Sequence, residues 1–368
     1  MSNSALSEPI LSALRPLCSE LAELNAGQDD PKQLAAVLER SPITSLLLPT
    51  GAGGLGGNWA DLIGAATIAA RASGSAAWLI SHYAANAALV GRFAESVHQE
   101  VWASPTPWVA QALRAQTPVC RSAADHVVVS GEWPLVTGAA HAQWVLLQAP
   151  GPDTGDVVLL VPRQKLEAAD LDYLGGLRGV GFQHLMAREI EVPASHVIAR
   201  EMLFAKVPQG VAGEASSASA SAEPYWLNAQ LGSVLGCAEG GYEEYREITS
   251  QWVGGVAGNK VAALTQVQSR LAHTRTDLKT ASLLTTDIVG RVGRDSAELL
   301  AGERSHVARL CLESLARLVH QMGARGLFDT NPLQRRYRDL RAMVAHDVFD
   351  WRRNMAGLGR LELGISSE

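Results

Sequence analysis

Two histidines have sequence surroundings in which an imidazole could do chemistry. His82 lies in the stretch LISHYAAN, among alanines and other apolar residues, and His346 lies in AMVAHDVF near the carboxy-terminal end. Apolar surroundings favour the neutral ring, which donates from one nitrogen and accepts at the other. Both are candidate acid or base groups, and a core histidine bonded to a backbone carbonyl is the structural alternative. His141 and His184 occur at predicted strand edges and are expected to be mainly structural, although the loop of His184 could bring it to a substrate.

Cysteines and glycines give weaker signals. The cysteines are far apart, with no CxxC pair and no histidine at zinc-finger spacing, so we expect no metal site and no disulfide framework from Cys18, Cys120, Cys237 and Cys311. Glycines cluster from 51 to 57 in TGAGGLGGNW, but no Lys-Ser/Thr pair follows and no repeated strand-helix-strand units surround them. We interpret the cluster as a loop and not as a phosphate-binding site.

Composition excludes several classes of protein. The chain has 368 residues, of which 47% are hydrophobic and 18% charged, so it can bury a large core. A formal net charge of -6 argues against a nucleic-acid-binding surface, and the arginines at 335–353 are interspersed with aspartates, as on a paired, solvated helix face. The amino terminus lacks the pattern of a signal peptide, and the uncharged run from Ala72 to Gly91 contains several polar residues. We expect a cytoplasmic protein with no membrane span, in which this run is a buried helix.

Four segments with different patterns must position these residues. Apolar residues recur every three or four positions through residues 1–106, which predicts helices. Residues 107–210 change to short β-branched runs and predict an antiparallel sheet or small barrel, and residues 211–224 form an Ala/Ser-rich loop. Residues 225–368 return to helical patterns that should pack as a bundle. The long helical stretches of this last segment are expected at residues 256–292, 295–323 and 333–358. The predicted fold class is α+β.

Three strings carry a resemblance to a known family. They are GEWPLVTGAAHAQWVLL at 131–147, GLRGVGFQHLMAREIEVPASHVI at 176–198 and QMGARGLFDTNPLQRRYRDLRAMVAHDVFDW at 321–351. In this order they resemble the acyl-CoA dehydrogenase superfamily. The resemblance implies an amino-terminal helical domain, a central antiparallel β domain and a carboxy-terminal four-helix bundle. It also implies a bound flavin and, as the usual assembly, a homotetramer. Because the fold hosts several chemistries, the site must decide among them.

The base expected in a dehydrogenase of this family is missing. A carboxylate there removes the proton alpha to a thioester carbonyl. When the family pattern is laid on Gly323 to Leu327, Thr330 takes that position, and a threonine hydroxyl is not a general base at neutral pH. Asp329 stands next to it. An acyl-CoA dehydrogenase with a displaced carboxylate therefore remains an alternative, as does a non-catalytic flavoprotein.

The histidine that follows Arg338 and Asp339 after several residues resembles instead the flavin-dependent monooxygenase branch of the superfamily. This branch includes the oxygenase components that act on hydroxyphenylacetate and on dibenzothiophene. The resemblance gives catalytic roles to His346 and His82. It implies that reduced FMN or FAD arrives from a separate flavin reductase, and that O2 oxygenates a small aromatic or heteroaromatic substrate through a C4a-hydroperoxyflavin. An apolar cavity must then keep water away from the peroxide.

The resemblance also implies five flavin contacts. The Thr137 hydroxyl and the amide of Gly138 can bond the pyrimidine edge or N5, and the indole of Trp133 can pack on the ring. Gln321 and Gly323 resemble the segment that meets the phosphate end. Without the resemblance, Trp133 is a sheet core residue and Thr137 a turn hydroxyl. The loop Gly179–Leu185 departs from the usual G-T-G-S of the family, so the hydroxyl contacts expected there are missing.

Overall fold

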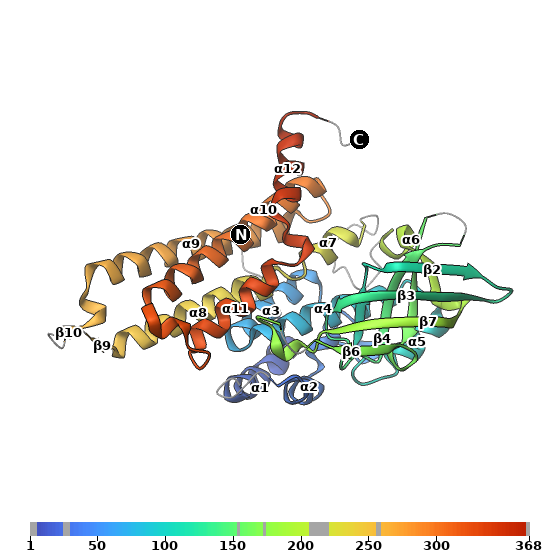
Figure 1. The fold of residues 1–368 in the computed structure, drawn as a ribbon, viewed down its shortest axis with the longest axis horizontal. Helices are drawn as coiled ribbons and strands as arrows, with labels where there is room; N and C mark the ends of the chain where they lie inside the picture. The colour runs from blue at the N-terminus through green and yellow to red at the C-terminus, as the bar shows by residue number, and fades with distance from the viewer. Residues whose placement is uncertain are drawn as a thin grey trace. The chain divides into compact units, whose positions relative to one another are not determined.

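The computed structural model describes residues 6–24, 30–152, 155–171, 174–205, 221–254 and 259–365. It contains two compact units, drawn as ribbons in Figure 1. The first unit comprises Met1–Ala65, Trp78–Leu174 and Arg178–Ala229. The second comprises Ala66–Ala77, Gly175–Leu177 and Gln230–Glu368.

Helices form the amino-terminal part of the chain, as its periodicity predicts. The described helices are α1 (Glu8–Leu24), α2 (Pro31–Glu39), α3 (Trp59–Ala72), α4 (Gly74–Val90) and α5 (Glu95–Trp102), with short 3-10 turns η1 (Pro42–Ser45) and η2 (Thr50–Ala52). Every residue of α4 is buried, so the uncharged run forms a helix within the core, as predicted. Among the described residues, no helix is long and apolar enough to cross a membrane.

The glycine cluster forms a tight turn. The amide of Gly56 donates to Leu48 O at 2.9 Å and the amide of Gly57 to Leu46 O at 2.9 Å. A Cβ at Gly54 would lie 2.1 Å from Leu48 O, so the backbone there passes too close for any larger residue. These amides are used within the chain, which agrees with a loop and leaves them unsuited to hold a phosphate.

Two four-stranded sheets form the β region. One has the order β1 (Val109–Ala112), β4 (Trp144–Pro150), β5 (Asp156–Pro162) and β8 (Val197–Ala199). The other has the order β2 (Gln116–Ser122), β3 (His126–Val136), β7 (Gln183–Pro193) and β6 (Glu167–Asp170). All these neighbours are antiparallel except β1, which runs parallel to β4. The expectation of a wholly antiparallel domain is wrong at this edge, because β1 and β4 are connected through the other sheet and not by a hairpin.

The predicted Ala/Ser-rich loop, residues 211–224, lies for the most part outside the described residues. The last two residues of this predicted loop belong to α7 (Glu223–Asn228). Helix α6 (Arg200–Phe204) lies before the loop in the chain. Pro224 occupies the first turn of α7, where its missing N–H costs nothing, which explains why a helix begins inside a segment predicted as loop.

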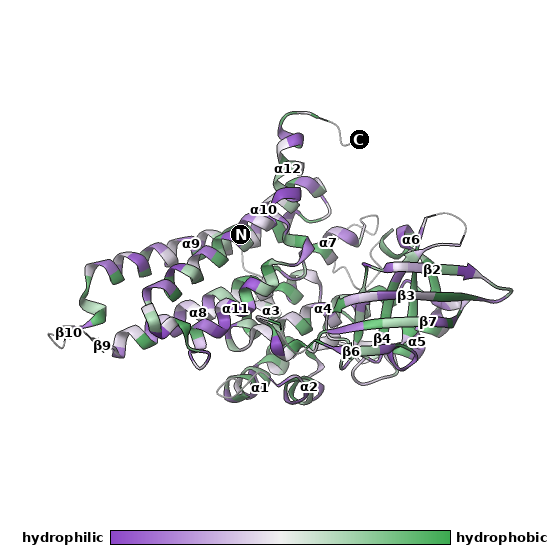
Figure 2. Ribbon diagram, viewed as in Figure 1, coloured by the Kyte–Doolittle hydropathy of each residue, from purple (hydrophilic) through white to green (hydrophobic). Residues whose placement is uncertain are grey.

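Long helices make up most of the second unit. They are α8 (Leu231–Gln251), α9 (Thr265–Arg291), α10 (Ala297–Gln321), α11 (Pro332–Val344) and α12 (Trp351–Glu362), with β9 (Val253–Gly254), β10 (Asn259–Lys260) and short turns η6 (Val261–Ala263), η7 (Gly323–Leu327) and η8 (Asp347–Phe349). Helix α10 packs against each of the other four helices, and hydrophilic and hydrophobic turns alternate along α9 and α10 (Figure 2). The bundle is confirmed, but the continuous helix expected at 333–358 is wrong, since it breaks between α11 and α12.

One arginine of the basic cluster is buried. Arg336 is 6% exposed, and its guanidinium donates to Glu244 Oε1 at 2.6 Å, Ala70 O at 3.0 Å and Arg71 O at 2.6 Å. It thus satisfies the last carbonyls of α3, which have no partner within that helix. The prediction of a solvated face is wrong for this residue, because its partners come from a segment some 265 residues earlier.

Candidate active site

A tight turn, residues 137–141, follows β3 and holds two of the predicted site residues. Gly138 has φ +70°, a conformation that favours glycine. Its carbonyl accepts from the hydroxyl of Tyr83 at 2.6 Å, and the next carbonyl, that of Ala139, accepts from Arg163 Nε at 3.0 Å. The side chains of Tyr83 from α4 and of Arg163, which directly follows β5, therefore fix this turn on the carbonyl side.

The same turn leaves polar groups without partners. Within the described part of the chain, the amides of Gly138 and Ala139 and the hydroxyl of Thr137 have no hydrogen-bond partner. Thr137 is only 8% exposed and Ala139 is fully buried. Buried backbone N–H groups are nearly always bonded, so these groups suit an acceptor that is not part of the described chain. Carbonyl oxygens and ring nitrogens of an isoalloxazine are acceptors of this kind.

A β-bulge sets the position of this turn. The pairing of β3 with β7 shifts between Trp133 and Val136, and Leu135 lies in the bulge with φ +56° and 53% of its surface exposed. Trp133 is fully buried, and its Nε1 donates to Gln148 O at 3.0 Å. The sequence prediction gave the Trp133 indole a place on the flavin ring, and the structure gives it a place in the core.

Leu135 was missed by the sequence analysis. A non-glycine residue in the left-handed region, with an exposed apolar side chain, is costly and tends to occur at functional sites. The signal that could have found it is Pro134, because a proline inside a strand pattern indicates a bulge.

His82 lies in the buried helix α4 and is 5% exposed. Its Nδ1 lies 2.8 Å from Trp78 O, and its ring lies 4.7 Å from the Trp78 ring. A carbonyl can only accept, so Nδ1 carries the hydrogen, and in the neutral ring Nε2 is the acceptor. The structural alternative and the catalytic one are thus compatible, because the backbone contact uses one nitrogen and defines the chemistry of the other.

His346 lies in the second unit, at the break between α11 and α12, and is half-buried. Its Nδ1 accepts from the amide of Val348 at 3.3 Å and so caps η8. An amide can only donate, so in the neutral ring the hydrogen is on Nε2. The carbonyl of Val348 accepts from Arg304 Nε at 2.8 Å and Asn354 Nδ2 at 2.9 Å. Burial, with the charge of Arg353, lowers the pKa of Arg304 to about 10.

The remaining predicted residues of the second unit lie at the end of α10. Gln321 is half-buried, and its Oε1 has no hydrogen-bond partner among the described residues. Gly323 begins η7 with φ +57°. Asp329, the alternative base, is ion-paired with Arg338, and its side chain is 72% exposed. Asp339, the neighbour of Arg338, accepts from the amide of Leu177 at 2.6 Å.

The unusual loop Gly179–Leu185 supports the turn by other means than hydroxyls. The carbonyl of Gly181 accepts from the amide of Ala140 at 3.2 Å. Gln183 accepts from Arg163 Nη2 at 2.5 Å and donates to Asp170 Oδ1 at 2.7 Å. Burial lowers the pKa of Arg163. An amide side chain thus links the guanidinium to a carboxylate beneath the turn.

The two other histidines lie in the turn and on β7. His141, in the turn, has a ring nitrogen without a hydrogen-bond partner in the described residues, and burial lowers its pKa despite the nearby carboxylates of Glu39, Asp30 and Asp170. His184 lies 3.3 Å from Glu132 across the β3–β7 pair. In the register of that pair Glu132 is next to the buried Trp133, so Glu132 and His184 lie on the opposite face from its indole.

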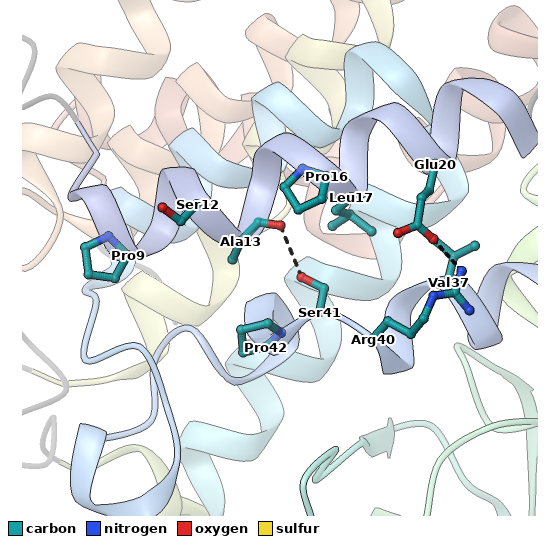
Figure 3. A pocket seen from close by; sticks show the side chains of 10 residues that line it. All are labelled: Pro9, Ser12, Ala13, Pro16, Leu17, Glu20, Val37, Arg40, Ser41 and Pro42. Atoms are coloured by element: carbon teal, nitrogen blue, oxygen red, sulfur yellow. Dashed lines mark hydrogen bonds and ion pairs between the residues drawn. The ribbon is translucent and has the colours of Figure 1, made fainter.

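A groove of about 340 Å³ lies elsewhere in the first unit, between α1 and the segment Val37–Pro42 (Figure 3). Figure 3 shows the Ser41 hydroxyl directed at the carbonyl of Ala13, and an ion pair between Arg40 and Glu20. None of the predicted site residues lines it. No group of three or more metal-binding side chains occurs in the residues that the structure describes.

Known proteins resemble this chain in sequence and in fold. Residues 230–351 match the family described as acyl-CoA dehydrogenase, C-terminal domain. The oxygenase subunit of a flavin-dependent monooxygenase from Rhodococcus jostii (strain RHA1) is 25% identical over 97% of this chain and 97% of its own length. The oxygenase component of an FADH2-dependent resorcinol hydroxylase from Rhizobium sp. (strain MTP-10005) is 24% identical over 91% of this chain and 88% of its own.

Among solved structures, XiaF from Streptomyces sp., in complex with FADH2 and glycerol, has a similar fold. Its TM-score is 0.85 at 18% identity, over 97% of this chain and 95% of that chain. The amino-terminal helices, the central β region and the carboxy-terminal bundle are thus those of a known architecture.

Proposed function

We propose that the chain works in the flavin-dependent monooxygenase branch of the acyl-CoA dehydrogenase superfamily, as the oxygenase component of a two-component system. It takes reduced FMN or FAD from a separate flavin reductase. One atom of O2 enters a small aromatic or heteroaromatic substrate, and the other leaves as water. Relatives over nearly the whole chain that are named as oxygenase components support this proposal.

The observation that carries the choice between oxygenation and dehydrogenation is the state of Asp329. Dehydrogenation needs a carboxylate held against the substrate to remove a carbon-bound proton. Asp329 is instead exposed to water and held by Arg338. Thr330, at the position where the family pattern places the base, offers only a hydroxyl.

The reduced flavin, when bound, supplies the activation of O2. The unpartnered groups of Thr137, Gly138 and Ala139 fit its acceptor edge, and Gln321 and Gly323 are proposed for its phosphate end. His82 and His346 are proposed as the catalytic histidines, and backbone contacts to their Nδ1 atoms hold the two rings. The buried surroundings of His82 exclude water from its side of the site.

A stopped-flow experiment tests the proposal. Anaerobic protein with reduced FMN or FAD is mixed with O2, and flavin absorbance is followed. We expect a transient that outlives the oxidation of free flavin and decays faster when substrate is present. Absence of a transient with both flavins would contradict the proposal. Bleaching of bound oxidised FAD by an acyl-CoA would support a dehydrogenase, and neither response a non-catalytic flavoprotein.

Two further features belong to this proposal: a cytoplasmic location and a homotetrameric assembly. Both rest on the sequence and on the superfamily. Sedimentation velocity of the purified full chain tests the assembly, with a single species of four chains as the expected result.

A further inference from the structure

Four residues of the first unit form a continuous chain of contacts that ends at the turn. Thr44 Oγ1 accepts from Trp108 Nε1 at 3.0 Å, and the Trp108 ring stacks on Tyr83 with centroids 5.1 Å apart and an angle of 6°. The hydroxyl of Tyr83 donates to Gly138 O at 2.6 Å. All three side chains are at most 1% exposed, so the stack has little freedom to move.

Tyr83 and Gly138 are matched to each other. A Cβ at Gly138 would lie 2.6 Å from the Tyr83 hydroxyl, so only glycine admits this contact. Burial raises the pKa of Tyr83 far above its usual range, which keeps the hydroxyl protonated and therefore a donor. The carbonyl of Gly138 also accepts from the amides of His141 and Ala142, each at 3.2 Å.

The contact fixes a whole peptide plane. The carbonyl of Gly138 and the amide of Ala139 belong to one peptide unit, which is planar and trans, so they point in opposite directions. A bond that holds the carbonyl toward Tyr83 therefore holds the Ala139 N–H away from it. That N–H is one of the unpartnered donors of the turn.

We propose that Tyr83 is a positioning residue for flavin binding, which orients the Ala139 amide by holding the carbonyl of the same peptide. This role rests on the proposed function, because the flavin is the acceptor. It places the positioning residue next to the candidate catalytic residue His82 on α4. A donor held in place before binding loses less conformational freedom when the ligand arrives.

Two matched variants test the role. Tyr83→Phe removes the hydroxyl but keeps the ring that stacks on Trp108. Thr44→Val removes a buried hydrogen bond at the other end of the same stack and leaves the turn untouched. Thr44→Val leaves the buried Trp108 N–H without its acceptor, whereas in Tyr83→Phe the carbonyl of Gly138 keeps two amide donors, so we expect the thermal midpoint to fall at least as far in Thr44→Val as in Tyr83→Phe. Anaerobic titration with reduced FMN and reduced FAD should give a Kd about tenfold higher for Tyr83→Phe, and a wild-type value for Thr44→Val.

Amide hydrogen exchange without flavin supplies a second measurement. In Tyr83→Phe the peptide that contains His141 and Ala142 should exchange faster, because the carbonyl that accepts from them is no longer held. A wild-type Kd in Tyr83→Phe, or an equal loss of affinity in Thr44→Val, would overturn the positioning role. If the wild-type protein binds neither flavin, the proposed function fails as well, and this outcome is distinguished by the wild-type titration alone.

Discussion

Two breaks in regular structure, one in each unit, satisfy their backbone groups differently. At the turn 137–141, side chains bond the carbonyls, while the amides of Gly138 and Ala139 have no acceptor in the described chain. At the break between α11 and α12, His346 takes the amide of Val348, and Arg304 and Asn354 take its carbonyl. The first break thus has backbone donors that a ligand could use. At the second break, side chains of the protein bond both the amide and the carbonyl of Val348.

The comparison extends to the two histidines. His82 gives the hydrogen of Nδ1 to a carbonyl, and His346 uses Nδ1 to accept from an amide. The backbone therefore assigns opposite characters to the two Nε2 atoms, an acceptor in His82 and a donor in His346. The backbone contacts thus give the two neutral rings opposite tautomers.

The largest expected effect separates the two tasks of His346. His346→Asn keeps an oxygen that can cap η8 but removes the imidazole, so we expect product formation to fall about 100-fold with an unchanged thermal midpoint. His346→Ala should lose the same activity and, in addition, about 1 kcal/mol of unfolding free energy. Product assays and thermal melts on both variants measure this. Full activity in His346→Asn would show that His346 serves only as the cap of η8.

A second prediction concerns the turn. Gly138→Ala places a Cβ against the Tyr83 hydroxyl in a left-handed conformation, and we expect a loss of about 2–4 kcal/mol of unfolding free energy together with weaker flavin binding. Gly53→Ala is the control, because Gly53 has φ +79° but no atom near the added Cβ. It should cost only about 1 kcal/mol, measured by urea unfolding. Equal losses in both variants would mean that the close contact has no effect.

A third prediction tests whether the second break is independent of the ligand. Asn354 is 6% exposed and donates to Val348 O and to Ser305 Oγ at 2.8 Å. Asn354→Leu should lower the unfolding free energy by about 1–2 kcal/mol. The Kd for reduced flavin, measured by anaerobic titration, should stay at the wild-type value if this break serves only to hold structure. A parallel loss of flavin affinity would show that the two breaks are coupled.

The smallest expected effect is a pH dependence at the turn. Burial lowers the pKa of His141 below 6.5, so the folded protein resists a proton that the unfolded chain accepts. The contribution of His141 to stability is therefore complete above pH 6.5 and declines as the pH falls below it. His141→Gln cannot titrate, and between pH 7 and 5 it should lose less stability than the wild type, by under about 1 kcal/mol. Parallel pH profiles of urea unfolding for the two proteins would contradict this.

Much of the fold could be predicted from local patterns. The helices, the bundle and the strands follow from apolar periodicity and β-branched runs, because one buried face is enough to produce each pattern. The break after Val344 was missed, since AMVAHDVFDW keeps apolar residues at helical spacing. At the break, Val348 O accepts from Asn354 nearby and from Arg304, which lies 44 residues earlier in the chain. Such long-range contacts leave no local signal.

The sequence allows candidate site residues to be named, but it does not give the direction of their hydrogen bonds. His82, Thr137 and Gly138 stand in recognisable strings, whereas the direction of a hydrogen bond is decided only by what the fold places opposite it. Trp133 was given to the flavin because an indole next to a turn suits a ring, and its full burial could not be seen in a strand with a bulge. Tyr83 carried no signal, because its partner is 55 residues away.

The guanidinium of Arg336 has a consequence for how this protein is made. During synthesis α3 emerges early, with the carbonyls of Ala70 and Arg71 awaiting donors that the ribosome adds only near the end of translation. The nascent chain must keep that helix end hydrated, or held by a chaperone, until α11 arrives. Premature termination before α11 would therefore remove part of the bundle. It would also leave the carboxy-terminal end of α3 without the donors that Arg336 supplies.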